Sequence, residues 1–178
     1  LDVVGIADWI NSEPLSIQQT LDENKVVLVD FWTYTCVNCL RTLPFLKDWH
    51  NKYADRGLVI LGVHSPEFEF EKDLGNVQDA VAQEGVLWPV ALDSDMRTWD
   101  AFGNRFWPAK YLFTPSGGLG YTHFGEGAYV ETEEEIRAAL EAAGWDDSDI
   151  PVGTVNNTQR DPNANRITRE LYGGYQRS

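Results

Sequence analysis

The first candidates for chemistry are the only two cysteines of the chain, Cys36 and Cys39, which are separated by two residues. Two thiols at this spacing at the start of a helix can close a disulfide with little backbone movement. The thiol nearer the helix start meets unpaired N–H groups and the positive end of the helix dipole, which lower its pKa. We therefore predict that Cys36 is the nucleophile and that Cys39, one turn further in, is the more buried resolving thiol.

A zinc half-site is the alternative use of a cysteine pair, but structural zinc needs four ligands. A second cysteine pair is absent, and the three histidines, His50, His64 and His123, are scattered along the chain. We therefore expect no metal and no added cofactor, with the Cys36–Cys39 disulfide as the redox group. We expect His64 and His123 to be structural.

The residues around the cysteine pair have the pattern of an α/β fold. The apolar run at 26–29 is typical of a buried central strand, and a second such run follows at 58–63. Between them, leucines at spacings of three and four predict a helix that begins near Cys36 and contains Pro44. A strand, a helix and a strand in this order form a βαβ unit, so we expect the two strands to be parallel.

The remaining elements are predicted from periodicity and turn signals. Thr132 and Glu135 form a capping box, which predicts the start of a final helix that Gly144 ends. Further helices are predicted at 16–23, 73–84 and 95–102, and further strands at 90–92, 110–114 and 119–124.

Two segments resemble the thioredoxin family. Asp30–Cys39 resembles the thioredoxin active-site segment in order and spacing, and Pro44 matches the proline that kinks the following helix. Asn104–Phe113 resembles the segment that holds the cis-proline. The resemblance covers about residues 25–143 and implies a thioredoxin fold, with a central mixed β-sheet flanked by helices.

A narrower resemblance comes from the segments between and after these motifs. The stretch 65–90 resembles the insertion of the TlpA/ResA-like, extracytoplasmic branch of the family. Four short motifs resemble the soluble domain of DipZ-type proteins: Trp32–Cys36, Gly62–Phe68, Phe106–Tyr111 and Thr122–Gly127. In that family the domain is fused or coupled to a CcdA/DsbD-like membrane electron carrier.

The resemblance implies a protein thiol–disulfide oxidoreductase that reduces or exchanges disulfides of extracytoplasmic proteins. It implies a place in the periplasm or on the outer face of the cell membrane, and a CcdA/DsbD-like electron donor. The resemblance is compatible with a membrane anchor in the full-length protein and with a role in cytochrome c maturation. Val37–Asn38 replaces the Gly-Pro of thioredoxin between the cysteines, so the thioredoxin redox potential does not transfer.

Two residues are candidates for support of the thiol chemistry. Asp30, at the end of a buried strand, should have a pKa raised by desolvation and could relay a proton to or from Cys39. Pro108, if cis, would place the preceding backbone opposite Cys36, where it can pair with a substrate strand.

Further candidates surround the cysteines. Trp107 replaces the small or β-branched residue usual before the cis-proline and should reshape the partner groove. Glu67 and Glu69 are candidates for an acidic residue near the site, although a solvated loop charge is the simpler interpretation. The candidate substrate-binding residues of the apolar rim are Trp32, Tyr34, Trp107 and Pro108.

Composition and length bound the remaining possibilities. The chain has 178 residues and a net charge of −14, which disfavours binding to nucleic acid or to anionic lipid. Near Asp146 the composition shifts to a tail rich in Asn, Gly and Arg. We predict a thioredoxin-like domain over 1–146 and an extended segment, or a linker to a further domain, over 147–178. With Leu1 in place of Met at the start, we expect a fragment of a longer protein.

Two alternative functions stay open. Thr33 lies three residues before Cys36, as in the Thr-x-x-Cys element of peroxiredoxins, which would suggest a thiol peroxidase. Val29 occupies the position where that element has a proline, which weakens this hypothesis. The other alternative is a module that docks a partner without catalysis, and the presence of both cysteines argues against it.

Overall fold

The computed structural model describes residues 1–153 and 155, and a six-stranded mixed sheet forms its centre. The strands are β1 (Asp8–Ile10), β2 (Val26–Trp32), β3 (Leu58–His64), β4 (Val90–Leu92), β5 (Ala109–Thr114) and β6 (Gly118–Phe124), in the order β1-β4-β3-β2-β5-β6. The helices are α1 (Ile17–Asp22), α2 (Val37–Tyr53), α3 (Leu74–Glu84), α4 (Arg97–Ala101) and α5 (Tyr129–Ala142), with 3-10 turns η1 (Ala54–Arg56) and η2 (Glu69–Lys72).

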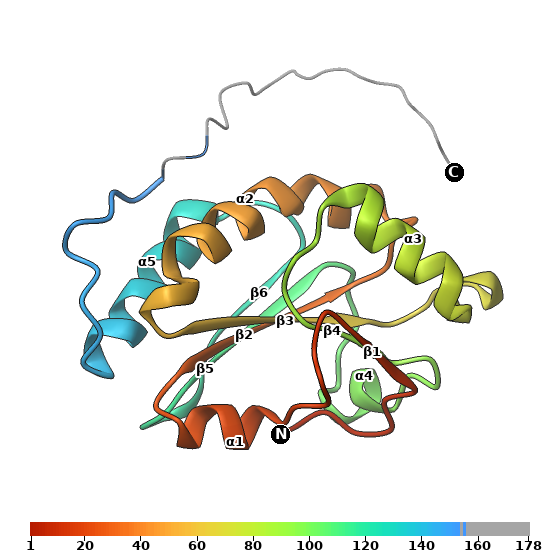
Figure 1. Ribbon diagram of the computed structural model, residues 1–178, viewed down its shortest axis with the longest axis horizontal. Helices are drawn as coiled ribbons and strands as arrows, with labels where there is room; N and C mark the ends of the chain where they lie inside the picture. Colours follow the sequence, from red (N-terminus) through yellow and green to blue (C-terminus); the bar gives the residue numbers. More distant parts are fainter. Residues whose placement is uncertain (154, 156–178) are drawn as a thin grey trace.

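Helices cover both faces of the sheet. In Figure 1, α2, α3 and α5 lie on one face, and α1 and α4 lie on the other. Every residue of β2 is buried, because its alternate side chains enter two separate cores. Leu28 and Trp32 enter the core beneath α2, whereas Val29 and Phe31 enter the core beneath α1.

The strand pairing confirms the predicted βαβ unit. β2 and β3 are parallel, and Asp30 is in register with Gly62. β5 lies antiparallel on the other side of β2, with Lys110 in register with Asp30. The segment between β3 and the proline-containing loop contains η2, α3, β4 and α4, and β4 extends the sheet parallel to β3. The short edge strand β1 pairs with β4 and was not predicted from the sequence.

The start of α5 corrects one prediction. The helix begins at Tyr129, so the predicted capping box of Thr132 and Glu135 does not start it. Tyr129 stacks on Phe45 of α2 with ring centroids 3.6 Å apart, so the first turn of the helix packs against α2. The hydroxyl group of Thr132 instead lies 3.0 Å from that of Tyr121 on β6.

The first residues of the predicted C-terminal segment pack against α5. Asp147 is 2% exposed, and Arg137 donates hydrogen bonds to the carbonyl oxygens of Asp147 and Ile150. The N–H of Gly153 donates to Glu133 at 2.9 Å. The rest of this segment lies outside the described residues, so the division into domains stays a prediction. Within the described part of the chain, no helix is long and apolar enough to cross a bilayer.

Candidate active site

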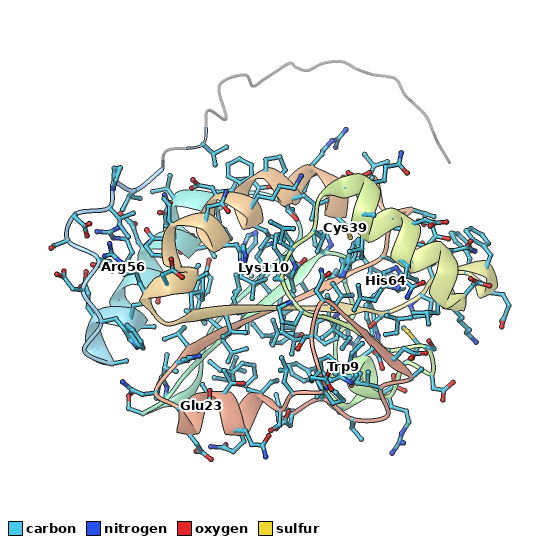
Figure 2. The ribbon with its side chains drawn as sticks, in the orientation of Figure 1. Trp9, Glu23, Cys39, Arg56, His64 and Lys110 are labelled. Atoms are coloured by element: carbon cyan, nitrogen blue, oxygen red, sulfur yellow. The ribbon has the colours of Figure 1, made fainter. Side chains whose placement is uncertain are left out.

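Cys36 and Cys39 lie at the start of α2, and their surroundings differ. Cys36 is the N-cap residue, and its Sγ accepts a hydrogen bond from the N–H of Cys39 at 3.2 Å. Both thiols are free; Cys36 is partly exposed, whereas Cys39 is 1% exposed. Figure 2 shows Cys39 at this end of α2, above the sheet. The predicted difference in exposure between the two cysteines is therefore present.

The pKa values of the two thiols shift in opposite directions. The hydrogen bond from the Cys39 thiol lowers the pKa of Cys36, and the N–H groups of Cys39 and Asn38 add to this, against burial and the charge of Asp30. Burial raises the pKa of Cys39 well above its ordinary value, and Cys36 and Asp30 raise it further. The thiolate therefore forms first on Cys36, the partly exposed sulfur.

A buried ion pair lies beneath the cysteines. Asp30 Oδ1 lies 3.4 Å from Lys110 Nζ, and both side chains are 2% exposed. Burial raises the pKa of Asp30, as predicted, although the charge of Lys110 opposes this shift. Neither atom has another hydrogen-bond partner within the described residues. Lys110 was not predicted as a site residue, because its contact with Asp30 depends on how β5 pairs with β2.

The peptide bond between Trp107 and Pro108 is cis. The indole N–H of Trp107 donates to the carbonyl oxygen of Ser65 at 2.8 Å, which ties this loop to the end of β3. The Trp107 ring also packs on Trp99, with ring centroids 4.2 Å apart. Trp107 as a whole is partly buried.

Glu71 joins the segment after β3 to the residues before Cys36. It is 1% exposed, and its carboxylate accepts hydrogen bonds from the hydroxyl groups of Thr33, at 2.7 Å, and Thr35. The backbone N–H groups of Glu67 and Phe68 donate to the same carboxylate at 2.7 and 3.2 Å. Burial would raise the pKa of Glu71, but these four hydrogen bonds lower it below its ordinary value.

The position of Glu71 also bears on two predictions. The acidic side chain that contacts the segment before Cys36 is Glu71, whereas Glu67 is exposed and reaches this network through its N–H. The hydroxyl group of Thr33, which the peroxidase hypothesis needs, donates to the buried carboxylate. Glu71 was not predicted as a site residue, because its contacts with Thr33 and Thr35 form only in the folded chain.

His64 supports the same segment from the end of β3. Its Nε2 accepts a hydrogen bond from the N–H of Tyr34 at 3.2 Å, and the two rings stack with centroids 5.6 Å apart. Burial lowers the pKa of His64 to about 4, so the ring is neutral at pH 7. His123 is farther out, and its Nε2 lies 3.0 Å from the carbonyl oxygen of Glu126.

Trp32 does not lie on the rim of the site, which corrects its predicted role in substrate binding. The side chain is 2% exposed, because β2 is covered on both faces and the ring enters the core beneath α2. It packs over Gly62, where a Cβ atom would lie 3.1 Å from Trp32 Nε1. Tyr34 and Trp107 are partly exposed and remain candidates for the rim.

Metal binding has no support in the described part of the chain. Within it, no group of three or more His, Cys, Asp and Glu side chains could hold a metal ion. The residues that the fold brings together at this site are instead two thiols, a buried Asp–Lys pair and a buried glutamate.

Comparison with known proteins agrees with this geometry. Residues 11–116 match the Redoxin family model. The chain is 42% identical over 145 residues to protein DipZ of Mycobacterium tuberculosis, which covers 80% of this chain and 21% of DipZ. It is 30% identical over 139 residues to thiol-disulfide oxidoreductase YkuV of Bacillus subtilis, covering 78% of this chain and 92% of YkuV. The solution structure of a thioredoxin-like protein in the oxidized form has a TM-score of 0.70 at 28% identity, covering 79% of this chain and 93% of that one.

The fold and the dithiol site define a thioredoxin-fold thiol–disulfide oxidoreductase. The chain belongs to the Redoxin family, and the resemblance to DipZ-type and ResA-like proteins is confirmed. It spans about a fifth of the length of the DipZ relatives that it matches.

Proposed function

We propose that this domain reduces or exchanges disulfides of extracytoplasmic proteins through the Cys36–Cys39 dithiol. The observation that carries the proposal is the contrast between the two sulfurs. Cys36 is accessible and has a lowered pKa, whereas Cys39 is buried and has a raised pKa. The exchange reaction needs two such groups. One thiol attacks the substrate first, and the second reacts only after the substrate is bound as a mixed disulfide.

The reaction proceeds in two balanced steps. The Cys36 thiolate attacks one sulfur of a substrate disulfide, which forms a mixed disulfide and releases the other substrate sulfur as a thiolate that takes up a proton. Cys39 then loses its proton and attacks Cys36 Sγ, which closes the Cys36–Cys39 disulfide and releases the second substrate thiol. Counted from the dithiol with both cysteines protonated, the substrate gains two electrons and two protons, and the domain loses them.

Nearby groups support these steps. Asp30 lies close enough to Cys39 for its charge to raise the pKa of that thiol, so it is the candidate acceptor for the Cys39 proton. The backbone before Pro108 offers pairing groups to the substrate chain, and Tyr34 and Trp107 provide apolar contact beside it. The dithiol itself carries the electrons, so the proposed reaction uses no added cofactor.

The similarity to DipZ supports our proposal for the partners and the location. We propose a CcdA/DsbD-like membrane protein as the donor that reduces the Cys36–Cys39 disulfide again after each cycle. We place the domain in the periplasm or on the outer face of the membrane, with the disulfide form of apocytochrome c among its substrates. A redox potential close to that of DsbA, about −120 mV, would instead indicate an oxidase.

Trapping tests the proposal. Cys39→Ala removes the resolving thiol, so a mixed disulfide should accumulate on Cys36 and be visible as a reducible adduct by non-reducing electrophoresis and mass spectrometry. Cys36→Ala is the matched control and should trap little. If Cys36→Ala trapped substrates and Cys39→Ala did not, the assignment of the nucleophile would be wrong.

A further inference from the structure

Four consecutive residues after β3, residues 67–70, form an exposed turn in which acidic and aromatic side chains alternate. We call this segment the aromatic turn. Phe68 is 46% exposed and Phe70 is 54% exposed, and their rings stack with centroids 5.8 Å apart. Large side chains exposed as a contiguous pair, next to a reactive site, are typical of an interaction surface.

The aromatic turn is fixed to the active site. The rings of Phe70 and Tyr34 have centroids 6.5 Å apart, and Tyr34 lies two residues before Cys36. The Glu71 carboxylate binds the N–H of Phe68 and also the hydroxyl group of Thr33. The turn and the segment before Cys36 therefore share one buried anchor. A surface held in place in this way loses little conformational entropy when it binds a partner.

A second exposed aromatic pair lies next to the cis peptide bond. Phe106, which precedes Trp107, is 49% exposed, and Phe124 at the end of β6 is 46% exposed. Their ring centroids are 5.2 Å apart. Exposed aromatic side chains are thus present both on the turn beside Tyr34 and on the loop that holds Pro108. A substrate chain that crosses Cys36 in an extended form could contact both pairs.

The negative charge of the aromatic turn indicates which kind of partner it binds. Glu67 precedes Phe68 and Glu69 lies between the two phenylalanines; both acids are exposed, and Glu69 forms a surface ion pair with Lys72 at 3.4 Å. The chain as a whole has a net charge of −14, so a second copy would be repelled from this surface, as would an anionic membrane. A partner with apolar side chains and positive charge is favoured instead.

We propose that the aromatic turn recognises substrates of the domain: extended polypeptide segments with an aromatic or aliphatic residue and a Lys or Arg close to the reactive cysteine. This inference rests on the proposed function, because the cysteine must reach Cys36. The phenylalanines contact the apolar side chain, and Glu67 and Glu69 face the cation. An extended segment fits, because it presents both side chains beside an accessible sulfur.

Short peptides with one cysteine, carried as the mixed disulfide with thionitrobenzoate, test the preference directly. Attack by Cys36 on the peptide sulfur releases coloured thionitrobenzoate, and Cys39 then releases the peptide thiol. Three peptides differ only in the two residues beside the cysteine. The Phe–Lys peptide has Phe and Lys there, the Ser–Lys peptide has Ser and Lys, and the Phe–Glu peptide has Phe and Glu. Each rate is divided by the rate of the same protein with the neutral small molecule dithiodipyridine.

The native domain should react with the Phe–Lys peptide about tenfold faster than with the Ser–Lys peptide, as burial of one aromatic side chain would give. The double variant Phe68→Ser, Phe70→Ser should reduce this ratio to about twofold or less. The double variant Glu67→Gln, Glu69→Gln should instead remove the preference for Lys over Glu. Leu119→Ser is the matched control, because Leu119 is 42% exposed at the opposite end of β6.

The outcomes separate this inference from the proposed function. A phenylalanine double variant that keeps the native peptide ratio overturns the inference, as does a native domain that reacts with dithiodipyridine and shows no peptide preference. A native domain that does not react with dithiodipyridine overturns the proposed function itself, and the inference with it.

Discussion

The carboxylate of Glu71 accepts a hydrogen bond from the hydroxyl group of Thr33 at 2.7 Å, and this contact joins the segment after β3 to the residues that lead into Cys36. The two residues are far apart in the sequence, yet both are almost completely buried. Hydrogen bonds to a buried charged group are stronger than those between neutral groups. The carboxylate of Glu71, together with His64, therefore holds the backbone that leads to the reactive thiol.

Replacement of Glu71 should destabilise the domain. Glu71→Ala leaves two buried hydroxyl groups and two N–H groups without their acceptor, so we expect the free energy of unfolding to fall by about 3 kcal/mol. Glu69→Ala is the matched control in the same turn and should have little effect, because its side chain is 88% exposed. Urea denaturation measures both. Equal stability of the two variants would show that the Glu71 network contributes nothing.

Alkylation should distinguish the two thiols. The rate of Cys36 modification by iodoacetamide should rise with pH through a midpoint below that of an ordinary free cysteine, because its pKa is lowered. Cys39 should react only at much higher pH. Mass spectrometry of peptides locates the label. In Cys39→Ala the midpoint of Cys36 should move up, because the hydrogen bond from the Cys39 thiol is lost. An unchanged midpoint would contradict this assignment.

The Asp30–Lys110 pair should show strong coupling between its two residues. Asp30→Asn leaves the Lys110 ammonium buried without its counter-charge, so we expect a loss of about 3 kcal/mol in the free energy of unfolding. Lys110→Met should cost a similar amount. The double variant should be more stable than the sum of the two losses implies, because no unpaired charge remains. Additive losses in urea denaturation would argue against a direct pair.

His64 should make the stability of the domain depend on pH. Its pKa is about 4 in the folded protein and near 6.5 in an unfolded chain, so between these values only the unfolded chain binds the proton. This contribution is present above pH 6.5 and decreases by about 3 kcal/mol as the pH falls to 4. Urea denaturation at several pH values should give a weaker pH dependence for His64→Gln than for the native protein. His123→Gln, at a partly exposed histidine, is the matched control for the loss of an imidazole ring. If His64→Gln shows the same pH dependence of stability as the native protein, His64 does not make this contribution.

The sequence by itself determined the parts of this protein that depend on local pattern. The spacing of Cys36 and Cys39, the apolar run from 26 to 29 and the helical leucines around Pro44 are enough to predict the βαβ unit and the dithiol. The order of the two thiols was also predictable, because the N-terminus of a helix acts on whichever cysteine comes first. Each of these features involves residues that are close together in the chain.

Tertiary structure alone decided which distant residues complete the site. Lys110 reaches Asp30 because of the register between β5 and β2, which no local pattern encodes. Glu71 looks like one of several surface acids until the fold brings Thr33 to it. Trp32 was expected at the rim, but the helices on both faces of the sheet bury it. Pairing across the sheet and burial depend on the whole chain, and so does the placement of the buried charged groups near the thiols.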